Sequence, residues 1–132
     1  MIDINYVLKK FEVQANNANL LAIKRTDIES LFKLNSSQYL LSHSSTTKNS
    51  FKDVYTQVKI SLRAHNIDCL KIQSILIQFH MHSNYSKSRL RNGINIIFRT
   101  LNDETEVTIG NMINDNLSIN YFKLVIFLSV KE

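Results

Sequence analysis

Hydrophobic positions in the first half of the chain recur at the spacing of an α-helix. The clearest pattern lies between residues 50 and 66, where the side chains at helical spacing are Phe51, Val54, Tyr55, Val58, Leu62 and His65. This spacing predicts a helix with one buried side. Ser50 and Asp53 suit its start, because a hydroxyl can accept from a free backbone amide and a carboxylate favours the positive helix end.

Two shorter helices are predicted before this one. The first has an apolar side made by Ile4, Val7, Leu8 and Phe11, and a break is expected near Asn16, Asn17 and Asn19. The second begins with Thr26 and Glu29, the spacing of a capping box, and buries Ile28, Leu31 and Phe32. Residues 36–50 are rich in Ser and Thr and predict a surface loop.

The pattern changes to the alternation of a β-strand after Asn66. Over residues 70–82 the side chains Ile75, Ile77, Phe79 and Met81 alternate with Ser74, Gln78 and His80. Further strands are predicted at 93–101 and 105–109, which would form a hairpin around Asn102 and Asp103. The last predicted strand, 117–130, is apolar on both faces from Phe122 onward, which favours the core over a partner interface.

These elements predict an α+β fold, with N-terminal helices packed on a C-terminal antiparallel sheet of three to four strands. A chain of 132 residues fits a single domain, residues 1–132, that buries roughly two-thirds of its unfolded surface. The hydrophobic content of 44% is too high for a disordered chain.

Composition and charge bear on the cellular compartment and on the kind of partner. The single cysteine, Cys69, excludes a disulfide framework and indicates a reducing compartment. The first residues do not have the pattern of a signal peptide, so a cytoplasmic location is expected. The net charge of +5 is dispersed, which favours a solvated basic surface. The alternative is a small basic nucleic-acid or regulatory binding module that uses Lys87, Arg89 and Arg91.

The candidate chemical groups do not form a catalytic set. His80 and His82 have a spacing that metal sites use, but no third ligand is evident. Cys69 would need a base such as His65 to lower its pKa, and a buried cysteine that packs as a small hydrophobe is the simpler interpretation. The acidic residues are explained by helix capping and exposed turns. We therefore expect no enzymatic activity, no metal and no cofactor.

Two segments together resemble a known family: residues 23–36, Ile-Lys-Arg-Thr-Asp-Ile-Glu-Ser-Leu-Phe-Lys-Leu-Asn-Ser, and residues 61–72, Ser-Leu-Arg-Ala-His-Asn-Ile-Asp-Cys-Leu-Lys-Ile. The first is similar to an arginine-aspartate-leucine-x-x-leucine-leucine-asparagine-threonine segment of TssE, the baseplate wedge protein family of type VI secretion systems. Residues 61–72 are similar to the place where its last helix runs into its first strand. The family's glutamate-proline-arginine loop is absent there, and His65-Asn66-Ile67-Asp68 occupies its place. The resemblance covers residues 23–109.

This resemblance implies a non-enzymatic structural protein with a lysozyme-like fold. Its expected partners are baseplate wedge proteins and contractile sheath subunits, in a cytoplasmic assembly at the inner-membrane complex. It implies no small-molecule substrate and no membrane insertion, and it makes a nucleic-acid partner unlikely. The expected partner-binding residues are Arg63, His65, Asn66 and Asp68 in the helix-to-strand turn, followed by Arg25, Asp27 and Glu29. An open sheet edge would suit such a partner, because main-chain hydrogen bonds can extend it.

Overall fold

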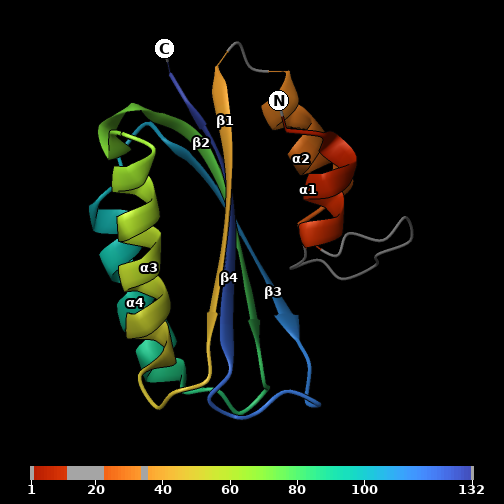
Figure 1. Cartoon of the computed structure of the whole chain (residues 1–132), viewed down its shortest axis with the longest axis vertical. Helices are drawn as coiled ribbons and strands as arrows, with labels where there is room; N and C mark the ends of the chain where they lie inside the picture. The colour runs from red at the N-terminus through yellow and green to blue at the C-terminus, as the bar shows by residue number, and fades with distance from the viewer. Residues whose placement is uncertain (1, 12–22, 34–35, 132) are drawn as a thin grey trace.

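A mixed β-sheet lies between two layers of helices in the computed structural model of the chain (Figure 1). The structure describes residues 2–11, 23–33 and 36–131, with every side chain among them except that of Phe98. The helices are α1 (Ile4–Lys10), α2 (Arg25–Phe32), α3 (Ser50–Ala64) and α4 (Lys87–Arg99), with a short 3₁₀ turn, η1, at Cys69–Lys71. The strands are β1 (Ser37–Ser45), β2 (Ile72–Met81), β3 (Glu106–Ile113) and β4 (Phe122–Val130).

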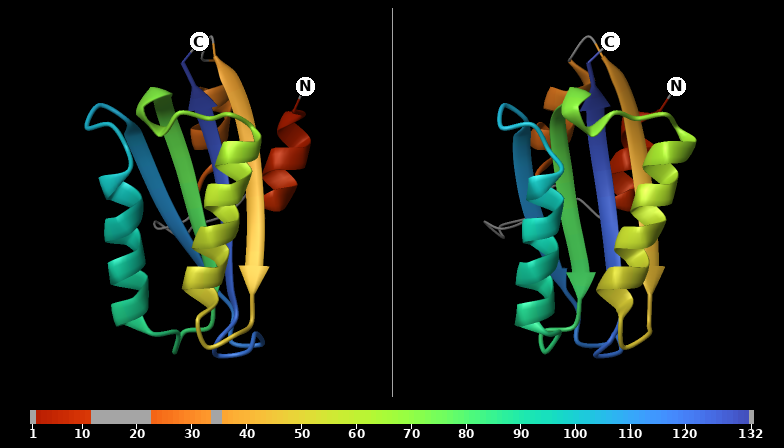
Figure 2. Two further views of the ribbon diagram at one scale, coloured as in Figure 1. Left: turned by 60° about the vertical axis from the view of Figure 1, so that its left-hand side comes forward. Right: turned by 90° about the vertical axis from the view of Figure 1, so that its left-hand side faces the viewer.

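The strand order β1-β4-β2-β3 places the last strand of the chain inside the sheet. β4 is antiparallel to both β1 and β2, whereas β2 and β3 are parallel. Parallel neighbours need a long crossover, and α4 supplies it between β2 and β3. α3 and α4 lie on one face of the sheet, and α1 and α2 lie on the other (Figures 1 and 2).

The core is divided by the sheet into two clusters that share β4. Even-numbered β4 side chains, such as Phe122 and Ile126, pack under α3 and α4. Odd-numbered ones, such as Val125 and Phe127, pack under α1 and α2. Most of β4 is buried on both faces, so the prediction that residues 122–130 belong to the core is confirmed.

The predicted α+β class is confirmed, with helices packed on a four-stranded sheet in the described residues. The helices near residues 4–11, 26–32 and 50–64 and the strands near 72–81, 106–113 and 122–130 also form where their patterns indicate. Two of the three strand pairs are antiparallel as expected, and the third, β2 with β3, is parallel. The break predicted near Asn16 lies outside the described residues.

The predicted loop at residues 36–50 is wrong for most of its length, because residues 37–45 form β1. This strand is polar, but each of its nine residues lies opposite a residue of β4. The backbone of β4 would otherwise leave one side of its hydrogen-bonding groups without partners in the sheet. Because strand propensity depends strongly on the neighbouring strands, a polar segment such as β1 can form a strand beside β4. Tyr39 and Leu41 pack on the α3 side and Leu40 on the α2 side.

The predicted strand at 93–101, and its hairpin with 105–109, are also wrong, because α4 occupies Lys87–Arg99. The alternation of Ile94, Ile96 and Phe98 suggested a strand. A second pattern, Leu90, Ile94, Ile97 and Leu101, has helical spacing, and all four side chains pack on the cluster under α3 and α4. Asn102 still forms a turn, accepting from the backbone amides of Glu104 and Thr105, but this turn joins α4 to β3.

Candidate functional site

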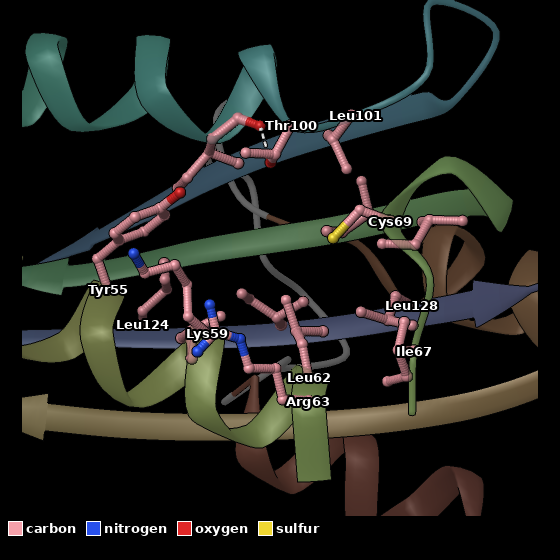
Figure 3. A pocket seen from close by; sticks show the side chains of 15 residues that line it. Tyr55, Lys59, Leu62, Arg63, Ile67, Cys69, Thr100, Leu101, Leu124 and Leu128 are labelled. Atoms are coloured by element: carbon pink, nitrogen blue, oxygen red, sulfur yellow. Dashed lines mark hydrogen bonds between the residues drawn. The ribbon is translucent and has the colours of Figure 1, made fainter. Parts of the chain in front are cut away.

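An apolar groove runs between α3 and α4, above the sheet. It consists of two hollows, of about 190 and about 390 Å³, and the side chain of Tyr55 lines both. The smaller hollow lies over β2 and β4 and is shown in Figure 3. The larger one lies where the first turns of the two helices face each other. We refer to the two hollows together as the α3–α4 groove.

The smaller hollow is walled almost entirely by hydrocarbon. Its floor is formed by strand residues, and its walls by side chains from α3, from the end of α4 and from the turn after α3: Ile72, Ile75, Leu124, Ile126, Leu128, Val58, Leu62, Ile67, Ile97 and Leu101. Tyr55 lies at one end of the hollow, and Ile67, Cys69 and Leu128 lie at the other (Figure 3). A cavity of about 150 Å³ can hold benzene, so this hollow has room for one aromatic or branched side chain.

Two side chains in the groove have a pKa that is raised by partial burial. Burial raises the pKa of the Cys69 thiol, and the neighbouring Asp68 carboxylate adds to the shift. Burial also raises the pKa of the Tyr55 hydroxyl, with a smaller contribution from Cys69. Desolvation disfavours the charged form of each group. These shifts agree with the apolar lining of the smaller hollow, which favours burial of an apolar ligand.

The mouth of the groove is basic. Lys52, Lys59 and Arg63 on α3 and Arg89 on α4 line the two hollows, and no carboxylate among the described residues does so. The ammonium of Lys59 lies 5.2 Å from the centre of the Tyr55 ring, a cation–π contact. Arg89 donates a hydrogen bond to the backbone carbonyl of Lys48.

In the larger hollow α3 and α4 approach closely at Gly93. A Cβ atom at this position would lie 1.9 Å from the ring of Phe51, so only glycine fits the present spacing of the helices. The Phe51 ring packs in turn on Phe122, with ring centres 5.1 Å apart. Ile96, in the next turn of α4, lines the hollow and is 42% exposed. At this end of the groove α3 and α4 are therefore closely packed, and Ile96 still leaves apolar surface exposed.

The helix-to-strand turn predicted to bind a partner forms one end of this groove. Asn66 has a φ of 55° and ends α3 in the left-handed conformation that stops helices. The amide of Ile67 donates to the carbonyl of Leu62, and that of Asn66 donates to Arg63, which is the Schellman arrangement. Asp68 caps η1 by accepting from the Leu70 amide at 3.0 Å.

The predicted partner-binding residues in this turn point to different places. Arg63 lines the groove, whereas the ring of His65 packs against Tyr39, with ring centres 5.4 Å apart. Asn66 and Asp68 are exposed and have the backbone roles described above. Of these four, only Arg63 contributes a side chain to the groove.

The second group of predicted residues is on the opposite face of the sheet. Asp27 caps α2 by accepting from the Lys24 amide at 2.8 Å, two residues before the predicted start at Thr26. Arg25 pairs with Glu29 at 2.7 Å, one helical turn away. α2 belongs to the cluster under α1 and α2. The two groups of predicted residues therefore do not form one site.

The remaining chemical candidates are dispersed. His80 is buried in β2, while His82, just beyond β2, lies 3.7 Å from Asp115 and accepts from the Asn84 amide. No three His, Cys, Asp or Glu side chains of residues 2–11, 23–33 and 36–131 gather as metal ligands would. Lys87 and Arg91 are exposed on α4, and nucleic-acid binding by this segment stays a prediction. In the part of the chain that the structure describes, no helix is long and apolar enough to cross a bilayer.

The comparisons with known proteins identify a fold and not a family. No family model matches the sequence, and no curated protein matches it. Among solved structures, the chain is similar to a structure described as "FtsZ dimer, empty" from M. jannaschii, with 15% identity and a TM-score of 0.60 over 86% of this chain and 32% of that one. A tryptophan-to-tyrosine mutant of the same FtsZ gives 15% identity and a TM-score of 0.64, over 95% and 37%.

At this identity the likeness shows a shared fold alone, and the chain spans about a third of the FtsZ chains it matches. The fold differs from the lysozyme-like fold that the resemblance to TssE implies.

Sequence reasoning missed the groove because it missed α4. A strand at residues 93–101, as the alternation predicts, leaves the groove without the wall that α4 provides. The spacing of Leu90, Ile94, Ile97 and Leu101 was the signal that identifies this wall, and Ser86 was a further one. The amide of Arg89 donates weakly to the Ser86 hydroxyl, at 3.4 Å, near the start of α4.

Proposed function

We propose that this protein is a non-enzymatic protein-binding module whose α3–α4 groove takes apolar side chains of a partner protein. The observation that carries the proposal is the α3–α4 groove itself. The groove is apolar, has basic side chains at its mouth and is open between the two helices. A concave apolar surface with a few polar groups at its edge is the usual form of a binding site.

The chemistry of the groove supports binding over catalysis. Its one nucleophilic candidate, Cys69, has a raised pKa, so its thiol stays protonated near neutral pH and is a poor nucleophile. The nearby imidazole of His65 packs on Tyr39. The groove cations are not accompanied by an acid among the described residues that line it. Such a site attracts a partner without offering the paired groups of acid–base chemistry.

A role in a contractile injection baseplate stays a prediction. Its support is the sequence resemblance of residues 23–109 to TssE, and a groove that binds a neighbouring subunit is compatible with that role. A cytoplasmic location likewise stays a prediction, supported by the single unpaired cysteine. The proposal of a protein-binding groove does not depend on either.

The proposal can be tested with a library of random peptides displayed on phage and selected on the whole chain. Because Cys69 is the only cysteine and lines the groove, its reaction with a thiol reagent reports directly on occupancy. We expect selected peptides to slow the modification of Cys69. They should also lose affinity for the Leu62→Glu variant, since a charge there is placed against the hydrocarbon wall.

The matched control is Ile60→Glu, on the same helix but outside the groove, where the native side chain is 60% exposed. This variant should bind the selected peptides as the native chain does, with both variants checked for folding by circular dichroism. Peptides that bind without protecting Cys69, or that distinguish neither variant, would show that the groove is not the binding site.

A further inference from the structure

We propose that the partner segment in the α3–α4 groove is a short acidic amphipathic helix. This inference rests on the proposed function and specifies its ligand. The segment binds as a folded helix and not as an extended peptide, and the residues that flank its apolar anchors are acidic and not neutral or basic. Each of these choices follows from a different feature of the groove.

The acidic character follows from the charges at the mouth. Lys52 and Arg89 lie beside the larger hollow, and Lys59 and Arg63 lie beside the smaller one, so both ends of the groove are cationic. No described carboxylate lines the groove to neutralise them. A basic segment would meet like charges at each end, while Asp or Glu side chains flanking the apolar anchors would find partners.

The helical form follows from the hydrogen bonding of the strands beneath the groove. The floor of the smaller hollow is made by β2 and β4, and each of these strands is paired on both sides within the sheet. The larger hollow is lined by α3, α4 and the residue before α3. An extended peptide over the groove would therefore find no free strand edge to bond with its main chain. A helix satisfies its backbone internally and presents only side chains, which is the helix-in-groove mode of recognition.

The length follows from the spacing of the hollows along α3. Phe51 and Tyr55 line the larger hollow, and Val58 and Leu62 line the smaller one, seven residues further along the helix. Seven residues of helix span about 10.5 Å, so a parallel or antiparallel ligand helix would place apolar anchors at positions i and i+7. The two hollows take these anchors, and acidic residues on either side of them face the cations.

A second copy of this chain is a poorer occupant. The chain carries a net charge of +5, so two basic groove faces would repel each other. α2 is the one described helix with more acidic than basic residues, and it buries its apolar side in the other cluster. A separate acidic partner therefore suits the groove better than self-association through it.

The experiment compares three synthetic peptides of about 16 residues, each with leucines at i and i+7. Glutamate occupies the flanking positions in the first peptide, glutamine in the second and lysine in the third. Affinity is measured by fluorescence anisotropy at low and high salt, and Cys69 modification is followed in parallel. We expect the acidic peptide to bind about tenfold more tightly than the glutamine peptide at low salt, as two or more exposed ion pairs would allow.

Charge reversal on the protein supplies a matched comparison. The double variant Lys59→Glu with Arg63→Glu should remove the preference for the acidic peptide. The double variant Lys9→Glu with Lys33→Glu changes the net charge equally, at exposed positions near the ends of α1 and α2 on the other face, and should keep the preference. Equal loss in both variants would mean that the attraction is due to net charge and would overturn the inference.

The outcomes separate this inference from the proposed function. If the glutamine peptide binds as tightly as the acidic one and both protect Cys69, the groove binds proteins but the acidic ligand is wrong. If only extended, proline-containing peptides protect Cys69, the helical form is wrong. If no peptide protects Cys69 and random libraries also yield none, the proposed function fails together with the inference.

Discussion

Asp53 is the residue that ties β1 to the start of α3. Its carboxylate accepts hydrogen bonds from the hydroxyl of Ser45, at 2.9 Å, and from that of Thr47. These two bonds lower the pKa of Asp53, against a smaller opposing effect of burial. The same carboxylate lies in the first turn of α3, where a negative charge is favoured. The sequence predicts the role of Asp53 at the start of α3. It does not predict the bonds to Ser45 and Thr47, because residues 36–50 are expected to form a loop.

We expect Asp53 to make stability depend on pH in the acid range. Because its folded pKa is lowered, its contribution is present above the unfolded value of about 3.9 and is lost as the pH falls through the folded value. Asp53→Asn should therefore destabilise the protein at neutral pH, and its difference from the native chain should shrink below about pH 4. Urea unfolding of both proteins across this range measures the effect.

The control for this prediction is Asp103→Asn, at an exposed position in the α4–β3 turn. It should change the stability little at any pH in the range. An Asp53→Asn difference that stays constant down to about pH 2 would show that the carboxylate bonds do not carry the effect.

At the scale of elements, β3 is an edge strand with little protection. Among the described residues β3 pairs only with β2. Its first residue is Glu106, but residues 107–113 carry no charged side chain and no proline. Ile109 and Ile113 are 36% and 51% exposed on it. Natural edge strands usually carry an inward charge, a proline or a bulge that blocks pairing with another chain. A strand of another chain could therefore pair with this edge and extend the sheet.

We expect this edge to promote self-association at high concentration. Ile113→Lys places a charge on the edge and should lower the weight-average mass measured by analytical ultracentrifugation. Ile119→Lys is the control, since Ile119 is equally exposed, at 53%, but lies outside the strands. The same reduction by both variants, or by neither, would contradict a specific role for the β3 edge.

At the scale of the whole molecule, β4 couples the two clusters of the core. Phe127 is fully buried under α2, where its ring lies 5.2 Å from that of Phe32, while its neighbours Ile126 and Leu128 face α3 and α4. A loss of packing on either face therefore loosens a strand that serves both. The packing of α3 and α4 on the sheet should accordingly be lost only together with that of α1 and α2.

We expect unfolding in urea to be a single transition. Phe127→Leu removes buried volume on the α2 side and should cost about 1–2 kcal/mol. Because the clusters are coupled, the midpoint of Cys69 exposure on the α3 side should shift by the same amount as the midpoint from circular dichroism. Cys69 exposure that keeps its native midpoint in this variant would show that the two faces unfold independently.

Parts of the fold could be predicted because their signals are local. Helix α3 has a long apolar stripe. The run of Val, Ile and Phe in β4 is compatible with a buried strand or a helix, and its β-branched and aromatic residues favour the strand. The failures have local causes too. β1 is polar, so no pattern within it marks a strand. In α4 the alternation of Ile94 and Ile96 competed with the helical spacing of Leu90, Ile94 and Ile97.

The sequence by itself determined the α+β class, the positions of α1, α2, α3, β2 and β4, and the presence of a single cysteine near a helix-to-strand turn. These depend on side-chain periodicity and on residues close in the chain. Only the tertiary structure decided that β1 is a strand, that β3 is parallel to β2, and that α3 and α4 form a groove. Strand pairing satisfies backbone groups that are far apart in the sequence, and a groove is the space left between two packed elements. Neither can therefore be deduced from the pattern of one segment.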